Sequence, residues 1–200
     1  MKILALELST ASGSLAWLDE NAASLTREWP NDRKNSAVFF ENLKAVTEKF
    51  GVPDRIIVGL GPGSYAGTRI AISAAIGLQV SSGAALIGFP SISAMECDAH
   101  EYCVIGDARR KSFFFARIRA NSLIEGPTLF SEAELMLKLD AIEIATPVFT
   151  SDCLLQFERA IVRSPSALLL ATLAREPQRS FSLPPLEPIY LREPHITMPR

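Results

Sequence analysis

Glycines and a serine gather in one short segment between a strand pattern and a helix pattern, and this segment is the clearest candidate for binding chemistry. An apolar run at residues 56–58 precedes it, and a helix pattern over residues 67–82 follows. Backbone amides at the start of a helix attract anions, and glycine lets another backbone approach closely. The alternative is a tight turn that only positions the helix, and the lack of a P-loop lysine favours it. We expect a structural loop, called the Gly-rich loop (residues 61–67), with Gly61, Pro62, Gly63, Ser64 and Gly67.

An acid and several hydroxyls at an earlier turn indicate a second kind of chemistry, the binding of magnesium and phosphate. Glu7 ends a strand pattern, and Ser9, Thr10 and Ser12 follow it. In ATPases of the actin, Hsp70 and sugar-kinase type, an Asp at such a turn positions hydrated magnesium. Glu7 is one methylene longer, and magnesium demands near-ideal octahedral geometry. An independent ATPase or sugar kinase is therefore an alternative function. The other interpretation is that the hydroxyls serve only as hydrogen-bond partners of the backbone amides in this turn.

The sequence contains no residue pattern that supports hydrolase activity. Zinc peptidases need converging histidines, commonly two on one helix face, whereas His100 and His195 lie far apart in the sequence. The three cysteines are odd in number and form no Cys-x-x-Cys, which argues against a disulfide framework or a zinc site. Ser64 has the wrong preceding residues for a nucleophile elbow. We expect no metal, no catalytic residues and no peptidase activity.

Two helix patterns carry more apolar residues than one sheet face needs. The first, over residues 36–50, has an apolar stripe and further apolar residues outside it. The second, over residues 67–82, is apolar on every side, as in a helix that is buried on every side. We predict that both contact another protein chain; the alternative is that they only bury each other. The predicted interface residues are Val38, Phe39, Phe40, Leu43, Val46, Arg69, Ile72, Ala75, Ile76 and Gln79.

A basic turn joins two strand patterns in the second half of the chain. Arg109, Arg110 and Lys111 form it, and three phenylalanines follow at residues 113–115. Basic residues beside aromatic ones are typical of contacts with RNA phosphates or bases. The alternative is a solvated turn followed by phenylalanines of a sheet core. RNA contact at this turn is therefore a hypothesis.

The elements that must position these residues alternate between strands and helices. The first half predicts strands over residues 2–8, 14–19, 22–29, 55–58 and 85–89, and helices over 36–50, 67–82 and about 91–99, with Ser36 as the first N-cap. The second half predicts strands over 102–107, 112–119 and 148–150, helices over 131–139 and 166–175, and an extended tail over 177–194. A hairpin thus opens each half. This repetition favours a duplicated α/β architecture, with domains over residues 1–100 and 101–200.

The composition is that of a folded protein of one or two small domains. The chain has 200 residues, of which 48% are hydrophobic and 21% charged. Its net charge of −2 offers no overall attraction to nucleic acid or membrane. The sequence opens in a strand pattern without a signal segment, and no stretch approaches the ~20 mainly apolar residues of a membrane span. We expect a cytoplasmic protein without membrane contact.

Four segments, in order along the chain, resemble the TsaB (YeaZ-like) family. They are ILALELSTASGSLAWLDE at residues 3–20, VGLGPGSYAGTRIAISAAIGL at 58–78, DARRKSFFFARI at 107–118 and PLEPIYLREP at 185–194. The resemblance covers essentially the whole chain. The Gly-rich string with its following Arg-Ile is the most specific part of it.

The resemblance implies an α/β fold of the actin-like (ASKHA, ribonuclease H-like) type, with two related domains of which the second is reduced. It implies a non-catalytic subunit that binds and activates the catalytic subunit TsaD, together with the ATPase TsaE. That complex transfers threonylcarbamoyl to the adenosine beside the anticodon of tRNA. The resemblance further implies a homodimer when the chain is isolated, only indirect contact with tRNA, and no cofactor. An inactive glycoprotease homologue is the remaining alternative.

The chain departs from the family pattern at two polar motifs. Residues 7–9 read Glu-Leu-Ser where the family usually has Asp-Thr-Ser or Asp-Thr-Ala, and residues 35–37 read Asn-Ser-Ala where it has a His-Ser-Glu-like triplet. Both changes remove polar groups, which argues against nucleotide or metal binding. The chain is also short for the family, so we expect a trimmed C-terminal domain.

Overall fold

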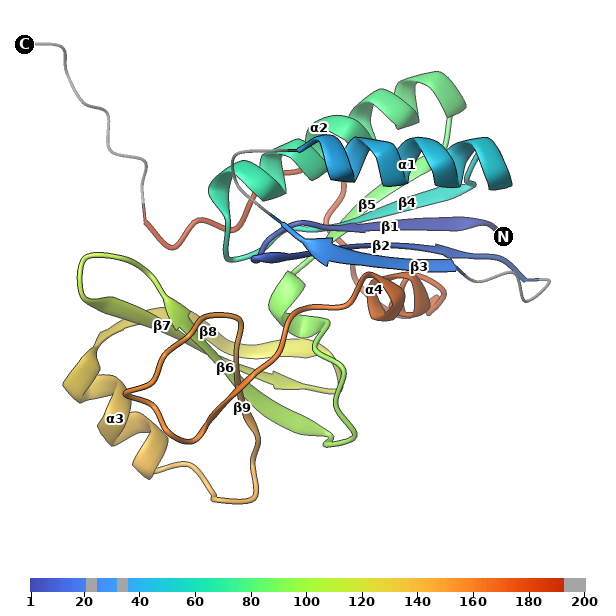
Figure 1. Cartoon of the computed structure of the whole chain (residues 1–200). Coiled ribbons are helices and arrows are strands. Elements are labelled where there is room, and N and C mark those ends of the chain that lie inside the picture. The colour runs from blue at the N-terminus through green and yellow to red at the C-terminus, as the bar shows by residue number, and fades with distance from the viewer. Residues whose placement is uncertain (21–24, 32–35, 193–200) are drawn as a thin grey trace, which may run out of the picture.

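The computed structural model describes residues 1–20, 25–31 and 36–192, and it contains two five-stranded sheets (Figure 1). The N-terminal sheet has the strand order β3-β2-β1-β4-β5, and the C-terminal sheet has the order β10-β9-β6-β7-β8. In each sheet the first three strands form an antiparallel meander, and two later strands run parallel to the first. The duplicated architecture that the repeated hairpin predicted is therefore confirmed.

The N-terminal sheet consists of β1 (Ile3–Glu7), β2 (Ser12–Leu18), β3 (Leu25–Pro30), β4 (Arg55–Gly59) and β5 (Ala85–Phe89). Helices α1 (Ala37–Phe50) and α2 (Tyr65–Ser82) cover one face, and α4 (Ala167–Leu173) covers the other (Figure 1). Because side chains alternate along a strand, Leu4 and Leu6 join the core under α1 and α2, whereas Ile3 and Ala5 join the core against α4. A sheet covered on both faces explains why its central strands are continuous apolar runs.

The C-terminal sheet consists of β6 (Glu101–Asp107), β7 (Ser112–Arg119), β8 (Ser122–Ser131), β9 (Val148–Thr150) and β10 (Ala160–Val162). Helix α3 (Glu132–Asp140) packs on one face through Leu135 and Leu139. The other face contacts the connector around the short 3₁₀ helix η1 (Ser91–Ser93), where Tyr102 and Phe114 share a core with Ile92. Residues 151–159 join β9 to β10 without a helix, at the place where α2 joins β4 to β5. The second half is therefore the reduced one, as expected.

The chain returns to the N-terminal sheet after β10. Helix α4 packs there against residues of β1, β2 and β4. We keep the division into domains 1–100 and 101–200 as a proposal, with the addition that α4 completes the core of the first unit. None of the helices in the described part of the chain is long and apolar enough to cross a membrane.

Local chemistry explains where the helices begin, and it corrects the expected start of α2. The Ser64 hydroxyl accepts a hydrogen bond from the Gly67 amide at 3.2 Å, so α2 begins at Tyr65 rather than at Gly67. A reciprocal capping box between Ser131 and Glu134 starts α3. Ser36 is the N-cap residue of α1, as predicted, but its side chain makes no capping hydrogen bond.

The helix expected over residues 91–99 is only the single turn η1. Backbone carbonyls that would accept hydrogen bonds within such a helix accept them from other segments. Ser93 O accepts from Asn121 Nδ2 at 2.9 Å, and Ala94 O accepts from the Ser166 amide at 2.9 Å. The segment therefore serves as the junction between the two sheets. The described part of the tail, residues 177–192, contains no helix, as predicted.

Candidate functional site

The Gly-rich loop lies in direct backbone contact with the turn between β1 and β2. The Ser64 amide donates to Ser9 O at 2.5 Å. A Cβ added to Gly63 would lie 2.1 Å from Ser9 O, and one added to Gly67 would lie 2.0 Å from Leu8 O. Neither glycine has a φ in the left-handed region, so glycine is needed here because two backbones meet without room for a side chain.

Three further hydrogen bonds fix the chain at the other end of the loop. The Gly61 amide donates to Ser91 Oγ at 2.9 Å, and the Ser91 amide donates back to Gly61 O at 2.8 Å. From the far end of the chain, the Ile189 amide donates to Leu60 O at 2.8 Å. These contacts attach the loop to the junction and to the tail. A loop attached in this way can hold α2 in position.

The Glu7 carboxyl is enclosed beneath this contact. The side chain is fully buried, and its Oε1 accepts from the Ser9 amide at 2.7 Å, while Oε2 has no hydrogen-bond partner among the described residues. A Cβ at Gly59 would lie 1.8 Å from Oε2, so the carboxyl occupies the space that this glycine leaves. Burial raises the pKa of Glu7 above the usual 4.5, and the hydroxyls of Ser9 and Ser91 lower it only in part.

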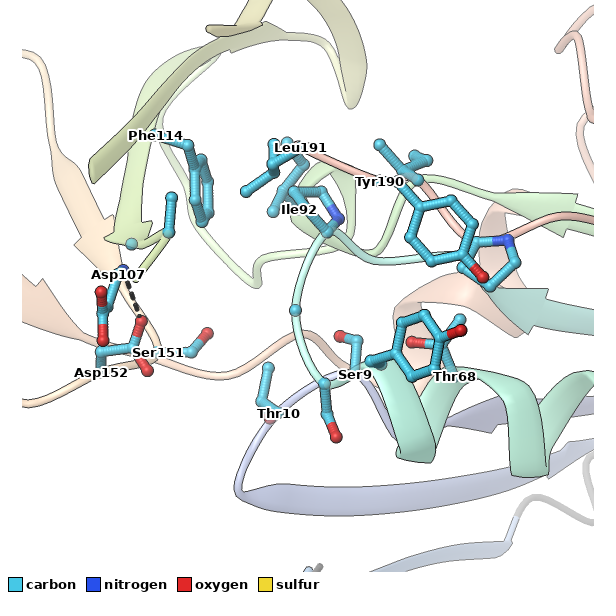
Figure 2. A pocket seen from close by; sticks show the side chains of 18 of the residues that line it. Ser9, Thr10, Thr68, Ile92, Asp107, Phe114, Ser151, Asp152, Tyr190 and Leu191 are labelled. Carbon is cyan, nitrogen blue, oxygen red and sulfur yellow. Dashed lines mark hydrogen bonds between the residues drawn. The ribbon is translucent and has the colours of Figure 1, made fainter. Parts of the chain in front are cut away.

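A cleft of about 450 Å³ separates the β1–β2 turn from the C-terminal sheet (Figure 2). Ser9 and Thr10 line one side of it, and Asp107, Ser151 and Asp152 line the side opposite. Apolar side chains, among them Ile92, Phe114 and Leu191, close it between these polar groups. Glu7 does not line the cleft, so its carboxyl is not available to a molecule bound there.

Sequence reasoning missed the two carboxylates of the cleft, although each lies at or just after the end of a strand. The Asp107 amide donates to Asp152 Oδ2 at 2.9 Å (Figure 2). The Asp107 carboxylate in turn accepts from the Arg109 amide at 2.7 Å and pairs with Arg109 Nη1 at 3.1 Å. The carboxylates are therefore already used to hold the β6–β7 turn. Their signal in the sequence was the position of an acid at a strand end.

The basic turn has an unusual backbone. Arg109, Arg110 and Lys111 have φ values of 64°, 54° and 57°, which place three successive residues in the left-handed region. All three are exposed, and the Arg192 side chain reaches the Arg109 carbonyl at 3.5 Å. The structure thus brings a fourth cation from the tail to the predicted RNA contact.

The predicted interface residues divide into a buried and an exposed set. Those that face this chain's own core are Phe39, Leu43, Val46, Ile72 and Ala75. Their side chains are not available to a partner, because they hold the two helices on the sheet. Those left accessible are Val38, Phe40, Arg69, Ile76 and, half-buried, Gln79. Val80 on α2 is 82% exposed, so α2 is not buried on every side within this chain.

Arg69 lies one turn inside α2 and contacts its own chain. Its guanidinium stacks over the Tyr65 ring, 3.8 Å from the ring centroid, and its Nε donates to the Tyr190 hydroxyl at 3.0 Å. Within the described residues no group of three or more His, Cys, Asp or Glu side chains is arranged to hold a metal ion. His195 lies outside them.

Comparisons with known proteins identify a family and relatives that this chain is similar to. The family model for TsaD, tRNA N6-adenosine threonylcarbamoyltransferase, matches residues 37–179. The uncharacterised protein ML0378 of Mycobacterium leprae is 28% identical over 142 residues, which are 70% of this chain and 38% of that protein. The chain therefore spans well under half the length of this curated relative.

Two solved structures from Pseudomonas aeruginosa share the fold. An uncharacterised protein with similarity to the peptidase YeaZ superposes with a TM-score of 0.76 at 20% identity, covering 96% of this chain and 99% of its own. YeaZ itself superposes with a TM-score of 0.68 at 19% identity, covering 87% and 91%. The predicted resemblance and the predicted actin-like fold are therefore confirmed. With the family model matching most of its length, this chain belongs to the TsaD family and has the fold of YeaZ.

Proposed function

We propose that this chain is a non-catalytic TsaB-type subunit that binds and activates a TsaD-family threonylcarbamoyltransferase in the cytoplasm. In this proposal it contributes a docking surface, TsaE joins the complex, and tRNA is the substrate of the assembly. The exposed parts of α1 and α2 form the docking surface, and in isolation they pair two copies of the chain. The basic turn at residues 109–111 is the proposed point of any RNA contact.

The burial of Glu7 beneath two touching backbones is the observation that carries the proposal. An ATPase of this fold would need a carboxylate directed into the cleft at the β1–β2 turn. Here the carboxyl points away from the cleft into a space beside Gly59, and burial favours its protonated form. The Ser9 carbonyl meets the Ser64 amide, so one of the loop's amides is already satisfied within the chain. The arrangement supports a framework role rather than phosphate chemistry.

An independent ATPase or sugar kinase is the competing function, because the cleft keeps hydroxyls and carboxylates on opposite sides. Thermal denaturation with and without Mg-ATP separates the two. A ligand present at a hundred times its dissociation constant would stabilise the fold by ~2.7 kcal/mol. We expect no shift with Mg-ATP and a clear shift with the purified TsaD subunit of the same organism. A shift with Mg-ATP together with phosphate release, and none with TsaD, would contradict the proposal.

A pair of substitutions on α2 tests the docking surface. Ile76 is 43% exposed, whereas Ala75 beside it is fully buried. Ile76→Arg should leave the melting temperature nearly unchanged and weaken TsaD binding at least ~10-fold, because a buried unpaired charge is costly at an interface. Ala75→Arg should unfold the protein, since it forces that charge into the core. Unchanged TsaD binding by a folded Ile76→Arg variant would place the interface elsewhere.

A further inference from the structure

The exposed face of α2 carries a guanidinium that two tyrosines hold in place. Tyr65 precedes Arg69 by one helical turn and stacks on it, whereas Tyr190 comes from the tail and accepts a hydrogen bond from Nε at 3.0 Å. The two rings lie 5.5 Å apart, measured between centroids. Tyr65 is 48% exposed and Tyr190 is 40% exposed, so the group lies at the surface. Tyrosine and arginine are the residue types that most often carry the binding energy of protein interfaces.

The tail is itself anchored on both sides of Tyr190. On one side, the Ile189 amide donates to Leu60 O at 2.8 Å, and Leu186 is buried in the core under α1 and α2. On the other side, Leu191 packs against the core of the C-terminal sheet. Tyr190 is therefore held in position by its neighbours, and the Arg69 side chain has lost much of its freedom before any partner arrives. Such preorganisation lowers the entropic cost of binding.

The rest of the guanidinium is not used within the described residues. Arg69 takes no part in any ion pair formed there, and its hydrogen bond uses Nε alone. The two terminal nitrogens thus present donors that match the two oxygens of a carboxylate. Tyr65 covers one face of the planar group, which leaves its edge as the place for an anion.

The surface around Arg69 indicates which kind of molecule brings that anion. Exposed residues lie before and after it along one face of α2 at helical spacing, and they are small or apolar: Ala66, Ser73, Ile76, Gly77 and Val80. Arg69 is the only charged residue of α2. RNA binding draws on several phosphates and several cations, which this face lacks. A protein helix packing closely on a small-residue face would bury the same surface and satisfy one arginine with one acidic side chain.

We propose that Arg69 anchors an aspartate or glutamate of a partner protein that packs on the exposed face of α2, and that Tyr65 and Tyr190 act as positioning residues for its guanidinium. The inference rests on the proposed function, in which that partner is a TsaD-family subunit. A second copy packed α2 against α2 could not supply the acid, because α2 contains no acidic residue. Pairing of Arg69 with the exposed Glu41 or Glu48 on α1 of a second copy would appear instead as loss of self-association in Arg69→Gln.

Calorimetric titration of the purified TsaD subunit tests the anchor. Arg69→Gln should weaken binding ~30-fold or more, because the acid of the partner is left buried and unpaired. Arg69→Lys should recover only part of the affinity, since an ammonium lacks the planar fork. Tyr190→Phe should cost a few-fold by releasing Nε, and Tyr65→Ala should cost a few-fold by removing the stacked ring. Arg119→Gln, an equal loss of charge at an exposed residue that does not line the cleft, is the matched control and should bind like wild type.

The outcomes separate the anchor from the function on which it rests. If the wild-type chain does not bind TsaD, the proposed function fails and the anchor fails with it. If wild type binds and folded Arg69→Gln binds equally well, the anchor alone is overturned. Loss of tRNA binding or of self-association in Arg69→Gln, with TsaD binding unchanged, would likewise overturn it by assigning the arginine to RNA or to a second copy. Restored affinity when one acidic residue of TsaD is replaced by lysine in combination with Arg69→Glu would identify the carboxylate.

Discussion

The two sheets have the same strand topology, but the turns of their first hairpins lie in opposite environments. In the N-terminal sheet, the β1–β2 turn lies against the Gly-rich loop, and Glu7 at the end of β1 is fully buried. In the C-terminal sheet, the corresponding β6–β7 turn is exposed and basic, and Asp107 at the end of β6 pairs with Arg109 at the edge of the cleft. The same place in the topology therefore forms part of a core in one half and a charged surface turn in the other.

The cause of the difference lies in the segment that follows the parallel strand next to each hairpin. After β4 come the Gly-rich loop and the long helix α2, whose backbone covers the β1–β2 turn. After β9 come residues 151–159, which contain no helix, and the Asp152 side chain holds the β6–β7 turn through its hydrogen bond with the Asp107 amide. Four substitutions test this contrast, from the largest expected effect to the smallest.

Gly63→Val should have the largest effect, because it breaks the backbone contact that closes the first turn. The added Cβ would lie 2.1 Å from Ser9 O, so the loop must move away from the turn. We expect a loss of more than ~4 kcal/mol of unfolding free energy, or no folded protein. Gly77→Ala is the control, since a Cβ there meets nothing within 4 Å, and it should be neutral or stabilise by up to ~1 kcal/mol. Urea denaturation measures both, and a wild-type midpoint for Gly63→Val would refute the contact.

Arg159→Met should destabilise the C-terminal sheet, which lacks the cover of an α2-like helix. The Arg159 guanidinium donates to Leu139 O at 2.8 Å, Ile142 O at 2.9 Å and Thr146 O at 3.1 Å, where α3 ends. Loss of several charge-assisted hydrogen bonds to half-buried carbonyls should cost ~2–4 kcal/mol. Arg119→Met removes only an exposed ion pair with Glu101 and should cost less than ~1 kcal/mol. Equal urea midpoints for the two variants would mean that Arg159 does not hold α3.

Glu7→Gln should stabilise the protein at neutral pH, because the amide keeps the acceptor for the Ser9 amide and removes the ionisable group. Burial raises the pKa of Glu7 in the folded state, so the folded protein holds the proton more tightly than the unfolded chain does. Stability therefore falls as pH rises from about 4.5 through the folded-state pKa. At pH 8 the gain should be ~1–3 kcal/mol, because the amide does not place a charge in the buried site, and it should shrink toward pH 5. A pH-independent loss of stability in urea melts would show that the carboxylate is favourably bound.

Arg110→Gly should have the smallest effect and the opposite sign to Gly63→Val. Arg110 has a φ of 54°, where a side chain is strained and glycine is not. The gain is offset by the greater freedom of glycine in the unfolded chain, so we expect a net stabilisation of ~0.5 kcal/mol or less. A differential melting measurement checks it. A loss above ~1 kcal/mol would mean that the Arg110 side chain makes a contact that holds the turn.

Local patterns predicted most elements of the fold. The apolar strand runs, the stripe of α1 and the repeated hairpin depend on spacing within a few residues, which is why their type and order were correct. β8 and β10 were missed for local reasons too. β8 contains Gly126 and Pro127, which interrupt a strand pattern and are accommodated by register shifts against β7, and β10 has only three residues.

The sequence by itself determined the order of the elements, the glycines at which two backbones meet, and the apolar character of α1 and α2. The tertiary structure alone decided that Glu7 is buried away from the cleft, that Ala75 faces the sheet while Ile76 faces outward, and that Tyr190 reaches Arg69. These outcomes depend on residues far apart in the chain. A helix that is apolar on every side does not reveal which side the sheet covers, and an extended tail does not reveal where it docks. Packing between distant segments settles both, because only the folded chain fixes which surfaces meet.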